Sequence, residues 1–465
     1  MCTRARSHSP CEFKSRQSQI LLTDQNEPIE SNMNNSPVEN TNDNPIDNLA
    51  LDSLPFVLGI LSNLAGHASP TAPVMERITT ANFEHYLASI GPTLHLTCFP
   101  FIPGEHIRVD VQLDFKSMAD FEVSGLRDQL LAKGETVIVL VNALIDAIMH
   151  DPDFMRLEAS WRNLSLLIEQ YSAAPNVQIM VGCCSKSTLP TGHGCPIAGW
   201  LDLDQIHHAT LPRFTAILFD FEFSHHPSDL DILEHLGASG AKHQTLILCS
   251  ADPELFGMEH WTGLPIPRSV AKIFGSNDYR EWNRFRQNEA AKWIFMTVCK
   301  VLLRVPNAME WELQQSKPFC SYNLCWTNSA TYLAAVLLEQ HKNGIYLEKL
   351  GGTKNASVKS LSTFSQQLKS GETVQVFPTE VSITKARIQE LESLGLNTLV
   401  RHSDPGNAFF PHLVCLATVN ESEENLEQKH TASSKHWNSI SLRMLSSRME
   451  HLGLVPADIE TILKQ

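Results

Sequence analysis

The sequence has no apolar run close to the roughly 18–20 residues that a helix needs to cross a lipid bilayer. Its first twenty residues contain Arg4, Arg6, Lys14 and Arg16 but no apolar core, so they do not read as a secretory signal. We therefore expect neither membrane insertion nor a secretory leader.

Basic residues are scarce relative to acidic ones. The chain has 36 Lys and Arg against 51 Asp and Glu, which gives a formal net charge of −15 at pH 7. Nucleic-acid binding relies on clustered Lys and Arg that neutralise phosphates, so we expect no nucleic-acid partner. The eleven cysteines are an odd number without the spacing of a disulfide framework, which indicates reduced thiols.

Metal-binding and phosphate-binding motifs are also missing. Cys183, Cys184, His193 and Cys195 are residue types that bind zinc, but their spacing contains no Cys-x-x-Cys pair. The Gly-x-Gly at 192–194 is not followed by Lys-Ser/Thr, so it is not a phosphate loop. We predict no metal site and no cofactor.

One group of residues leaves an enzymatic alternative open. Asp220 and Glu222 lie two positions apart in an expected strand, so their carboxylates share a face, and His225 and His226 follow. Such a set suits a hydrolase or a metalloenzyme. Metal analysis and a broad hydrolase screen would decide this alternative. Our prediction is that the chain is not an enzyme and has no catalytic residue.

The length and composition indicate a folded protein with one exceptional segment. At 465 residues the chain exceeds what a single hydrophobic core usually organises, and its 43% hydrophobic residues are typical of globular proteins. Residues 1–50, in contrast, are rich in Asn, Ser, Asp, Glu and Pro. Because this tract buries too little apolar surface to offset its ordering entropy, we predict a disordered polar tail.

Strand and helix patterns alternate after the tail. Apolar residues run without interruption from Phe56 to Leu61, as in a strand that is buried on both faces. An apolar stripe after Thr80 predicts a helix over 80–90, and strict alternation over 107–115 predicts a half-exposed strand. These patterns predict an α/β fold in which a mixed sheet is flanked by helices.

Residues 137–168 carry apolar side chains at helical spacing, and the pattern is interrupted at Pro152. The interruption predicts two helices rather than one. In the second helix we expect Trp161 to anchor the core. Glu158 and Arg162 lie four positions apart on one helical face, where a carboxylate and a guanidinium can pair.

The stretch 252–293 alternates Pro- and Gly-containing turns with aromatic residues and arginines. Trp261 and Trp282 supply large apolar faces. Four arginines have planar, multi-donor heads suited to carboxylate partners: Arg268, Arg280, Arg284 and Arg286. The candidate residues among them are Arg268, Arg284 and Arg286. We predict that these arginines form structural or inter-subunit pairs.

Motifs in the first part of the chain resemble those of TssB, the small sheath subunit of bacterial type VI secretion. They are LPFVLGILSNLAGH, NFEHYLASI and VDVQLDFKSMADF, in the same order and with similar spacing as in that family. The resemblance covers about residues 51–132, and none of these motifs contains a catalytic group.

The following part resembles TssC, the large sheath subunit. The motifs are HDPDFMRLEASWRNL, DPELFGMEHWTGLPIPRSVAKIF and DYREWNRFRQNEAAKW, and further on FPTEV, which contains Glu380. We expect Glu380 to lead into a strand and then a helix. That helix is expected to end at Gly395, a residue suited to a left-handed C-cap.

The two resemblances divide the chain. They imply a TssB-like small-subunit segment at 51–135 fused to a TssC-like large-subunit segment at 136–420. Residues 421–465 are expected to form a polar linker and C-terminal helices that resemble a shortened TssC end. The short junction and the early end predict a fusion with trimmed termini, and they leave open whether the chain polymerises alone.

The resemblance implies a contractile tail-sheath-like structural protein in the bacterial cytoplasm. Its expected partners are other sheath subunits, an inner tube of Hcp, a baseplate, and the ATPase ClpV, which dismantles the contracted sheath. The alternative is a non-polymerising adaptor or regulator that binds sheath or baseplate components. Whether separate sheath subunits coexist with this chain is not decided by its sequence.

Overall fold

A computed structural model of the chain describes residues 55–68, 75–135, 137–189, 214–305, 324–343, 351–367, 371 and 373–417. All of these residues belong to one compact unit, Pro45–Gln465. The predicted tail at 1–50 and the predicted C-terminal helices at 421–465 lie outside the described residues. Among the described helices, none is both long and apolar enough to cross a membrane.

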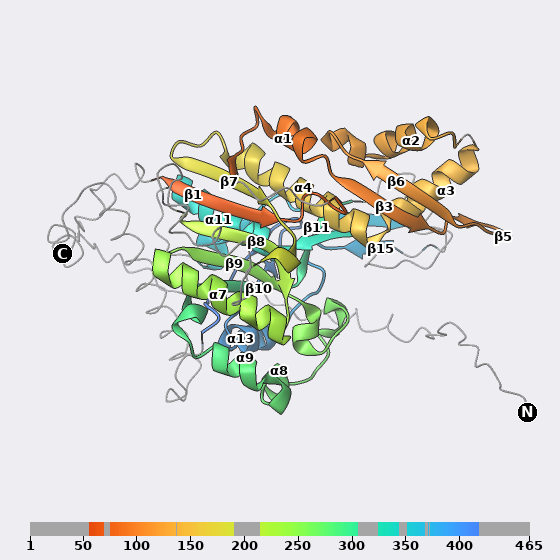
Figure 1. Cartoon of the computed structure of the whole chain (residues 1–465). Helices are drawn as coiled ribbons and strands as arrows, with labels where there is room; N and C mark the ends of the chain where they lie inside the picture. The colour runs from red at the N-terminus through yellow and green to blue at the C-terminus, as the bar shows by residue number, and fades with distance from the viewer. Residues whose placement is uncertain are drawn as a thin grey trace, which may run out of the picture. The chain divides into compact units, whose positions relative to one another are not determined.

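A seven-stranded mixed sheet forms the centre of the described structure (Figure 1). Six strands run parallel to their neighbours, and β2 pairs antiparallel with β7 at the edge. In spatial order the strands are β16 (Leu396–Thr398), β10 (Ile294–Val298), β9 (Leu246–Ala251), β8 (Ala216–Phe223), β1 (Phe56–Ser62), β7 (Val177–Cys183) and β2 (Glu76–Arg77). The predicted mixed sheet is confirmed.

Strand β1 comes from the first predicted segment but lies inside the sheet of the second. It pairs with β7 at one edge and with β8 at the other, and all seven of its residues are buried. The strand needs an uninterrupted apolar run because both of its faces lie against packed helices. The predicted buried strand is confirmed.

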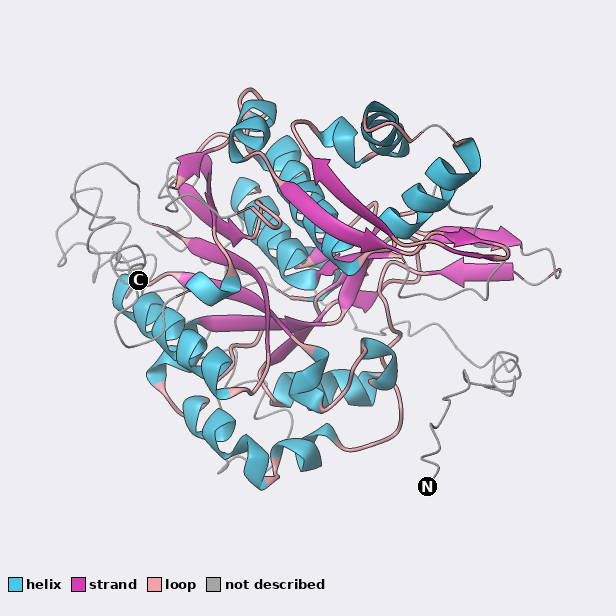
Figure 2. Cartoon of the chain, turned by 45° about the vertical axis from the view of Figure 1, so that its right-hand side comes forward, coloured by secondary structure: helices cyan, strands magenta, loops and turns pink. Residues whose placement is uncertain are grey.

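Helices cover both faces of the sheet (Figure 2). Phe56, Leu58 and Ile60 of β1 face one hydrophobic core, which includes residues of α4 (Pro152–Tyr171) and α11 (Ser329–Lys342). Val57 and Leu61 face a second core, which includes residues of α7 (Pro227–His243), α8 (Val270–Phe274) and α9 (Arg280–Phe285). Alternation along the strand thus divides the side chains between two separate layers.

The break that the sequence predicts near Pro152 separates α3 (Ile138–Met149) from α4. Asp151 forms the N-cap of α4, and its carboxylate accepts hydrogen bonds from the backbone amides of Asp153 and Phe154 at 2.9 and 3.4 Å. Pro152 occupies the first turn, where its missing N–H leaves no hydrogen bond unmade. The two-helix prediction is confirmed.

A second substructure surrounds an antiparallel ribbon of β3 (Thr93–Cys98) and β6 (Val109–Asp114). On β6, Val111 and Leu113 are buried while the intervening Asp110, Gln112 and Asp114 are exposed, as the alternation predicts. The ribbon is accompanied by α1 (Phe83–Ile90), the 3-10 helix η3 (Met118–Phe121), α2 (Val123–Ala132), β4 (Phe101–Ile102) and β5 (Glu105–His106).

The remaining elements are short and connect or cover the sheet. They are η4 (Lys186–Thr188), η5 (Pro253–Phe256), η6 (Trp261–Gly263), η7 (Asn277–Tyr279), η8 (Glu289–Trp293), β11 (Lys300–Arg304), β12 (Cys325–Asn328), α12 (Gly352–Asn355), β13 (Ser357–Val358), β14 (Phe364–Gln367), β15 (Thr373–Val376), α13 (Lys385–Ser393), β17 (Val400–Arg401) and β18 (Ala408–Phe409).

The segment after Glu380 differs from its prediction. No strand follows Glu380, because Thr384 already caps α13 by accepting a hydrogen bond from the Arg387 amide at 3.3 Å. The prediction of a strand here was wrong, because too few residues lie between the FPTE turn and this cap to form one. Gly395 has a φ of 76°, so the predicted left-handed residue after the helix is confirmed.

Gly237 provides a test of the packing between α7 and η8. A Cβ at this position would lie 2.4 Å from the carbonyl oxygen of Ala290 in η8. A helical Gly→Ala change ordinarily stabilises a protein by up to about 1 kcal/mol. Here we expect Gly237→Ala to lower the free energy of unfolding by about 1–3 kcal/mol through overpacking, as measured by urea unfolding.

Gly275→Ala is the matched control, because its Cβ would meet its nearest neighbours at an ordinary 3.5 Å. We expect it to be neutral or slightly stabilising. If both variants unfold at the urea concentration of the unmodified protein, the close approach of α7 to η8 is wrong.

Candidate functional site

The nine candidate residues fall into three places in the fold. Glu158, Trp161 and Arg162 lie together on α4. Trp261, Arg268, Trp282, Arg284 and Arg286 lie in the irregular layer that follows β9, and Glu380 lies beside the start of β11.

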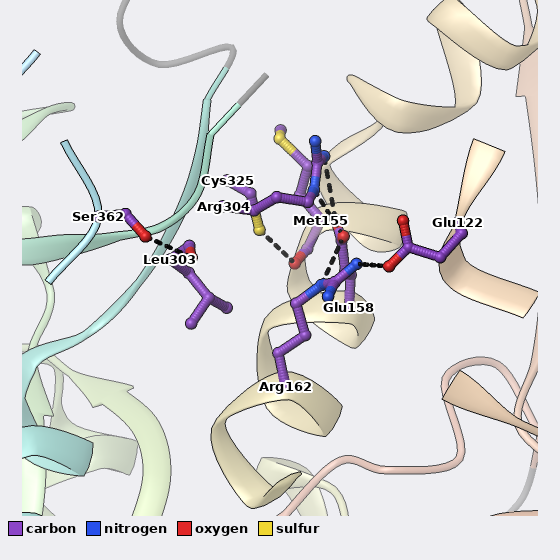
Figure 3. Close-up of polar contacts among 8 residues, drawn as sticks. All are labelled: Glu122, Met155, Glu158, Arg162, Leu303, Arg304, Cys325 and Ser362. Atoms are coloured by element: carbon purple, nitrogen blue, oxygen red, sulfur yellow. Dashed lines mark hydrogen bonds and ion pairs between the residues drawn. The ribbon is translucent and has the colours of Figure 1, made fainter. Parts of the chain in front are cut away.

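Glu158 is a fully buried carboxylate held by two arginines (Figure 3). Its Oε1 accepts hydrogen bonds from Nε of Arg162 at 2.8 Å and from Nε of Arg304 at 2.7 Å. Nη2 of Arg304 also donates to Oε2 at 3.2 Å. The predicted pair between Glu158 and Arg162 is confirmed, and the second arginine compensates further for removing the carboxylate from water.

The network continues into the small-subunit segment. Nη2 of Arg162 donates to Oε1 of Glu122, at the N-terminus of α2, at 2.7 Å. Burial by itself would lower the pKa of Arg162, but the carboxylates of Glu158 and Glu122 raise it above its ordinary value. Arg162 therefore remains charged and links α4 to the residues before the predicted boundary at 135.

Trp161 provides the apolar counterpart of this link. The side chain is fully buried, and its indole Nε1 donates to the carbonyl oxygen of Leu64 at 3.0 Å. Its ring packs edge-on against Phe83 and lies close to Tyr86, with centroid distances of 5.9 and 6.1 Å. The predicted core anchor is confirmed, and every one of these partners comes from the small-subunit segment.

Asp220 plays a structural part that the sequence did not suggest. Its Oδ2 accepts hydrogen bonds from the hydroxyls of Ser62 and Ser160 at 2.9 and 2.8 Å, and its Oδ1 accepts from Asn328 Nδ2 at 3.2 Å. These partners belong to β1, α4 and the cap of α11. The carboxylate thus ties a central strand to helices of one layer.

The other members of the enzymatic alternative point to different partners. Glu222 pairs with Lys300 at 2.8 Å, His225 stacks on Tyr279 at a centroid distance of 4.2 Å, and His226 caps α7. Cys183 and Cys184 are buried, whereas His193 and Cys195 lie outside the described residues. Within the described ranges, no group of three or more His, Cys, Asp or Glu side chains is arranged to hold a metal.

The two tryptophans of the 252–293 stretch are buried in an aromatic cluster. Trp261 packs edge-on against Phe256 at a centroid distance of 5.5 Å. Trp282 lies between Phe274 and Phe285, at 6.2 and 6.4 Å. This packing explains why a segment of short helices holds one shape: its aromatic side chains fill the layer beneath it.

The three candidate arginines of this stretch have different surroundings. The side chain of Arg286 is 4% exposed and donates a hydrogen bond to the carbonyl oxygen of Leu416 at 3.0 Å. Burial lowers the pKa of its guanidinium group to about 10. Arg268 and Arg284 are exposed, and Arg284 makes a surface pair with Glu281 at 3.4 Å. Arg286 is therefore a structural residue, while the other two guanidinium groups remain accessible to a partner.

Sequence reasoning missed a fourth arginine that supports this layer. Arg387 of α13 donates through Nη2 to the carbonyl oxygens of Ile266 and Arg268 at 3.1 and 2.6 Å, and through Nη1 to Glu390 at 2.5 Å. It fixes the backbone that carries the exposed Arg268. Its only sequence signal is an arginine three positions before a glutamate on a helix, which is too common to single it out.

Glu380 lines a pocket of about 340 Å³ at the carboxyl ends of β8 and β9 and the start of β11. The lining residues are Glu222, Asp252, Pro253, Glu254, Glu259, His260, Trp261, Lys300 and Glu380. Burial raises the pKa of the Glu380 carboxyl to about 7; Lys300 opposes this shift and Glu222 adds to it. With five carboxyl groups against one lysine, the pocket suits a basic group better than an anion.

Two family models match parts of the chain. Residues 136–192 and 211–414 match the VipB family, described as "EvpB/VC_A0108, tail sheath N-terminal domain". Residues 44–131 match the VipA family, described as "Type VI secretion system, VipA, VC_A0107 or Hcp2".

Individual relatives share low sequence identity with the chain. The type VI secretion system sheath protein TssC1 of Pseudomonas aeruginosa is 24% identical over 330 residues, which are 66% of this chain and 66% of that protein. Among solved structures, the contracted helical sheath of the anti-feeding prophage shares 11% sequence identity. The match covers 58% of this chain and 55% of that one, with a TM-score of 0.27.

The two family matches define a tail sheath protein. The VipB match extends over more than half of the chain, so the chain belongs to the type VI tail sheath family. More particularly, it is a fused TssB/TssC-like sheath protein, because the small-subunit match precedes the large-subunit match in the same polypeptide.

The Glu158 network predicts a large loss of stability on removal of its central charge. Glu158→Gln would leave Arg162 and Arg304 without their shared counter-charge in a buried site. We expect the free energy of unfolding to fall by about 3–5 kcal/mol in a urea titration. The control is Glu281→Gln, which breaks an exposed pair and should change stability by less than about 1 kcal/mol. Equal effects of the two changes would contradict the buried network.

Glu380 predicts a pH dependence. Because its pKa is raised in the folded state, the folded protein binds the proton more tightly than the unfolded chain does, so stability falls as pH rises from about 4.5 through about 7. The glutamine side chain in Glu380→Gln is neutral at every pH. The variant should therefore reduce the fall in the free energy of unfolding with rising pH, by at most on the order of 3 kcal/mol. Urea unfolding at several pH values measures it, with the exposed Glu254→Gln as control. An unchanged pH profile in Glu380→Gln would refute the assignment.

Proposed function

We propose that this chain is a structural subunit of a type VI secretion contractile sheath, which polymerises around an inner tube of Hcp and contracts to propel it. The observation that carries the proposal is the presence of both sheath-subunit families in one chain, with β1 of the first inside the sheet of the second. The proposal assigns the chain no catalytic activity and a cytoplasmic location in a bacterium.

A covalent link between the two halves has a physical consequence. Separate small and large subunits associate only as their concentrations permit, whereas a fused chain makes the association intramolecular. The buried contacts of Trp161, Glu158 and Asp220 would then form during folding of one polypeptide. Each chain would enter the sheath with its two subunit segments already joined.

Contraction needs subunits that keep their shape while the contacts between them rearrange. Two cores on opposite faces of one sheet support such rigidity, and so do the buried ion pairs between α4 and β11. In this proposal the energy of contraction is stored in the assembled lattice. The baseplate would start assembly, and the ATPase ClpV would dismantle the contracted form.

Electron microscopy of the purified chain tests the proposal. We expect tubules or stacked rings in negative stain. A chain that binds sheath or baseplate components but forms no polymer by itself or with them would instead be the second candidate, an adaptor or regulator.

The same assay tests the proposed contact role of the accessible arginines. We expect Arg268→Glu with Arg284→Glu to abolish assembly while leaving the urea midpoint almost unchanged, because both side chains are exposed. Lys272→Glu, an exposed charge reversal between them in the sequence, is the control and should assemble. Normal assembly of the double variant would show that these arginines are not subunit contacts.

A further inference from the structure

A basic surface lies on the irregular layer that follows β9. Between positions 265 and 287, four basic and two acidic side chains are exposed: Arg268, Lys272, Arg280, Arg284, Asp278 and Glu281. The whole chain, in contrast, has a formal net charge of −15. This layer is therefore a place on an acidic protein to which carboxylates are attracted. We call Arg268, Arg280 and Arg284 the α8–α9 arginine surface.

The two helices that carry this surface pack directly on each other. Nδ2 of Asn283 in α9 donates a hydrogen bond to the carbonyl oxygen of Phe274 in α8 at 2.6 Å. The rings of Phe274 and Trp282 lie 6.2 Å apart, so the buried faces of α8 and α9 meet. Arg280 and Arg284 are four positions apart in α9 and therefore share one face of that helix.

Arg268 is held close to the other two arginines. Arg387 donates a hydrogen bond to the carbonyl oxygen of Arg268 at 2.6 Å, which fixes the backbone before α8. Burial raises the pKa of Tyr279, and the charge of Arg268 opposes this rise. Tyr279 directly precedes α9, so the guanidinium group of Arg268 lies near the start of the helix that carries Arg280 and Arg284.

The described part of the chain ends beside this surface. Arg286, the C-cap of α9, donates a hydrogen bond to the carbonyl oxygen of Leu416 at 3.0 Å. A Cβ on Gly395, which follows α13, would lie 2.6 Å from the carbonyl oxygen of Cys415. α13 contacts α8, and in Figure 1 α8, α9 and α13 lie together below α7. The chain after position 417 therefore starts next to the elements that carry the arginines.

The sequence that follows is strongly acidic. Four of the seven residues at 421–427 are glutamates, and none of the seven is basic: Glu421, Glu423, Glu424 and Glu427. The four residues from 417 to 421 span at most about 14 Å. The six residues of α9 measure about 9 Å along the helix axis. The glutamates are thus within reach of Arg284 and Arg280, and carboxylates are the partners that guanidinium groups bind best.

The second acidic tract of the chain fits this surface less well. Residues 24–52 contain seven Asp and Glu side chains, spread over more than three times as many positions per charge as near the C-terminus of the described part. This tract joins the described structure ahead of β1, in the middle of the sheet, and not beside α9. Charge density and the point of attachment therefore both favour 421–427.

We propose that the acidic segment 421–427 docks on the α8–α9 arginine surface of the same chain. Each exposed ion pair is weak and is screened by salt, but the covalent connection gives the segment a high local concentration. The contact can therefore form within one chain and still be displaced. It covers Arg268 and Arg284 until another partner replaces it. This covering role rests on the contact role of the two arginines in the proposed function, whereas the docking itself does not.

Carbodiimide cross-linking of carboxylates to amines in the full-length chain tests the docking. Arg280→Lys keeps the positive charge and supplies an amine at an exposed position, so the urea midpoint should not change. We expect peptides that contain 421–427 to be linked to position 280. An equal mixture of isotope-labelled and unlabelled chains identifies the source, because a link within one chain contains a single isotope.

A pair of variants matched in charge tests whether the segment occupies the surface. The first variant combines Glu421→Gln, Glu423→Gln, Glu424→Gln and Glu427→Gln, and the control combines Asp24→Asn, Glu27→Gln, Glu30→Gln and Glu39→Gln. A fluorescent peptide with the sequence of 418–428 is the probe, and its anisotropy reports binding. We expect the first variant to bind the peptide about tenfold more tightly than the unmodified chain or the control. Such a ratio corresponds to a surface that is free about one tenth of the time in the unmodified chain.

Four results would overturn the inference. The first is the absence of any link between 421–427 and position 280. The second is a link that always joins different isotopes, which would assign the segment to a second copy. The third is a link to position 280 from residues 24–52 in place of 421–427. The fourth is equal affinity of the peptide for the first variant and the unmodified chain.

Electron microscopy separates this inference from the proposed function. Links within one chain, together with a failure to form tubules, would retain the docking and refute polymerisation. Tubules without such links would retain the sheath assignment and refute the docking. Where tubules form, the first variant should form them at a lower protein concentration than the unmodified chain, and an equal concentration would refute the covering role.

Discussion

The pairing of β1 with both β7 and β8 is the constraint on which the rest of the structure depends. If β1 were absent, the facing edges of β7 and β8 would leave backbone N–H and C=O groups unpaired inside two hydrophobic cores, and each such group costs about 1–3 kcal/mol. The small-subunit segment is therefore not an appendage of the large-subunit segment. It supplies an interior strand of a sheet that is incomplete without it.

Several polar side chains form hydrogen bonds across this join. Trp161 donates to Leu64, just after β1; Asp220 accepts from Ser62, at its end; and Glu158 is linked through Arg162 to Glu122. Hydrophobic burial holds the layers together but has little directional preference. Charged hydrogen bonds have strict geometry, so these pairs fix the register between the two segments while the apolar contacts supply most of the stabilisation.

Local features of the site could be predicted from the sequence, and distant partners could not. The buried β1 run, the alternation of β6, the break before α4 and the pair of Glu158 with Arg162 all arise from spacings of two to four residues. Arg304 lies 146 residues from Glu158, and Ser62 lies 158 residues from Asp220, so no periodicity links them. The same limit applies to the arginines: one motif contains Arg284, which is exposed, and Arg286, which is buried, and only the packing of α9 distinguishes them.

The distribution of charge and apolar surface separates the rigid interior from the part that can change contacts. The ion pairs that would be expensive to break lie inside, between elements of one chain, and so cannot be exchanged when neighbours move. The exposed Arg268 and Arg284 lie on the surface, where a contact can be lost and remade at a cost of a few kcal/mol. A sheath subunit needs this arrangement, because a lattice can switch between two states only if its internal contacts are much stronger than those between subunits. In a fused chain the small-to-large contact belongs to the first group, so under the proposed function the surface between chains is where contacts would rearrange.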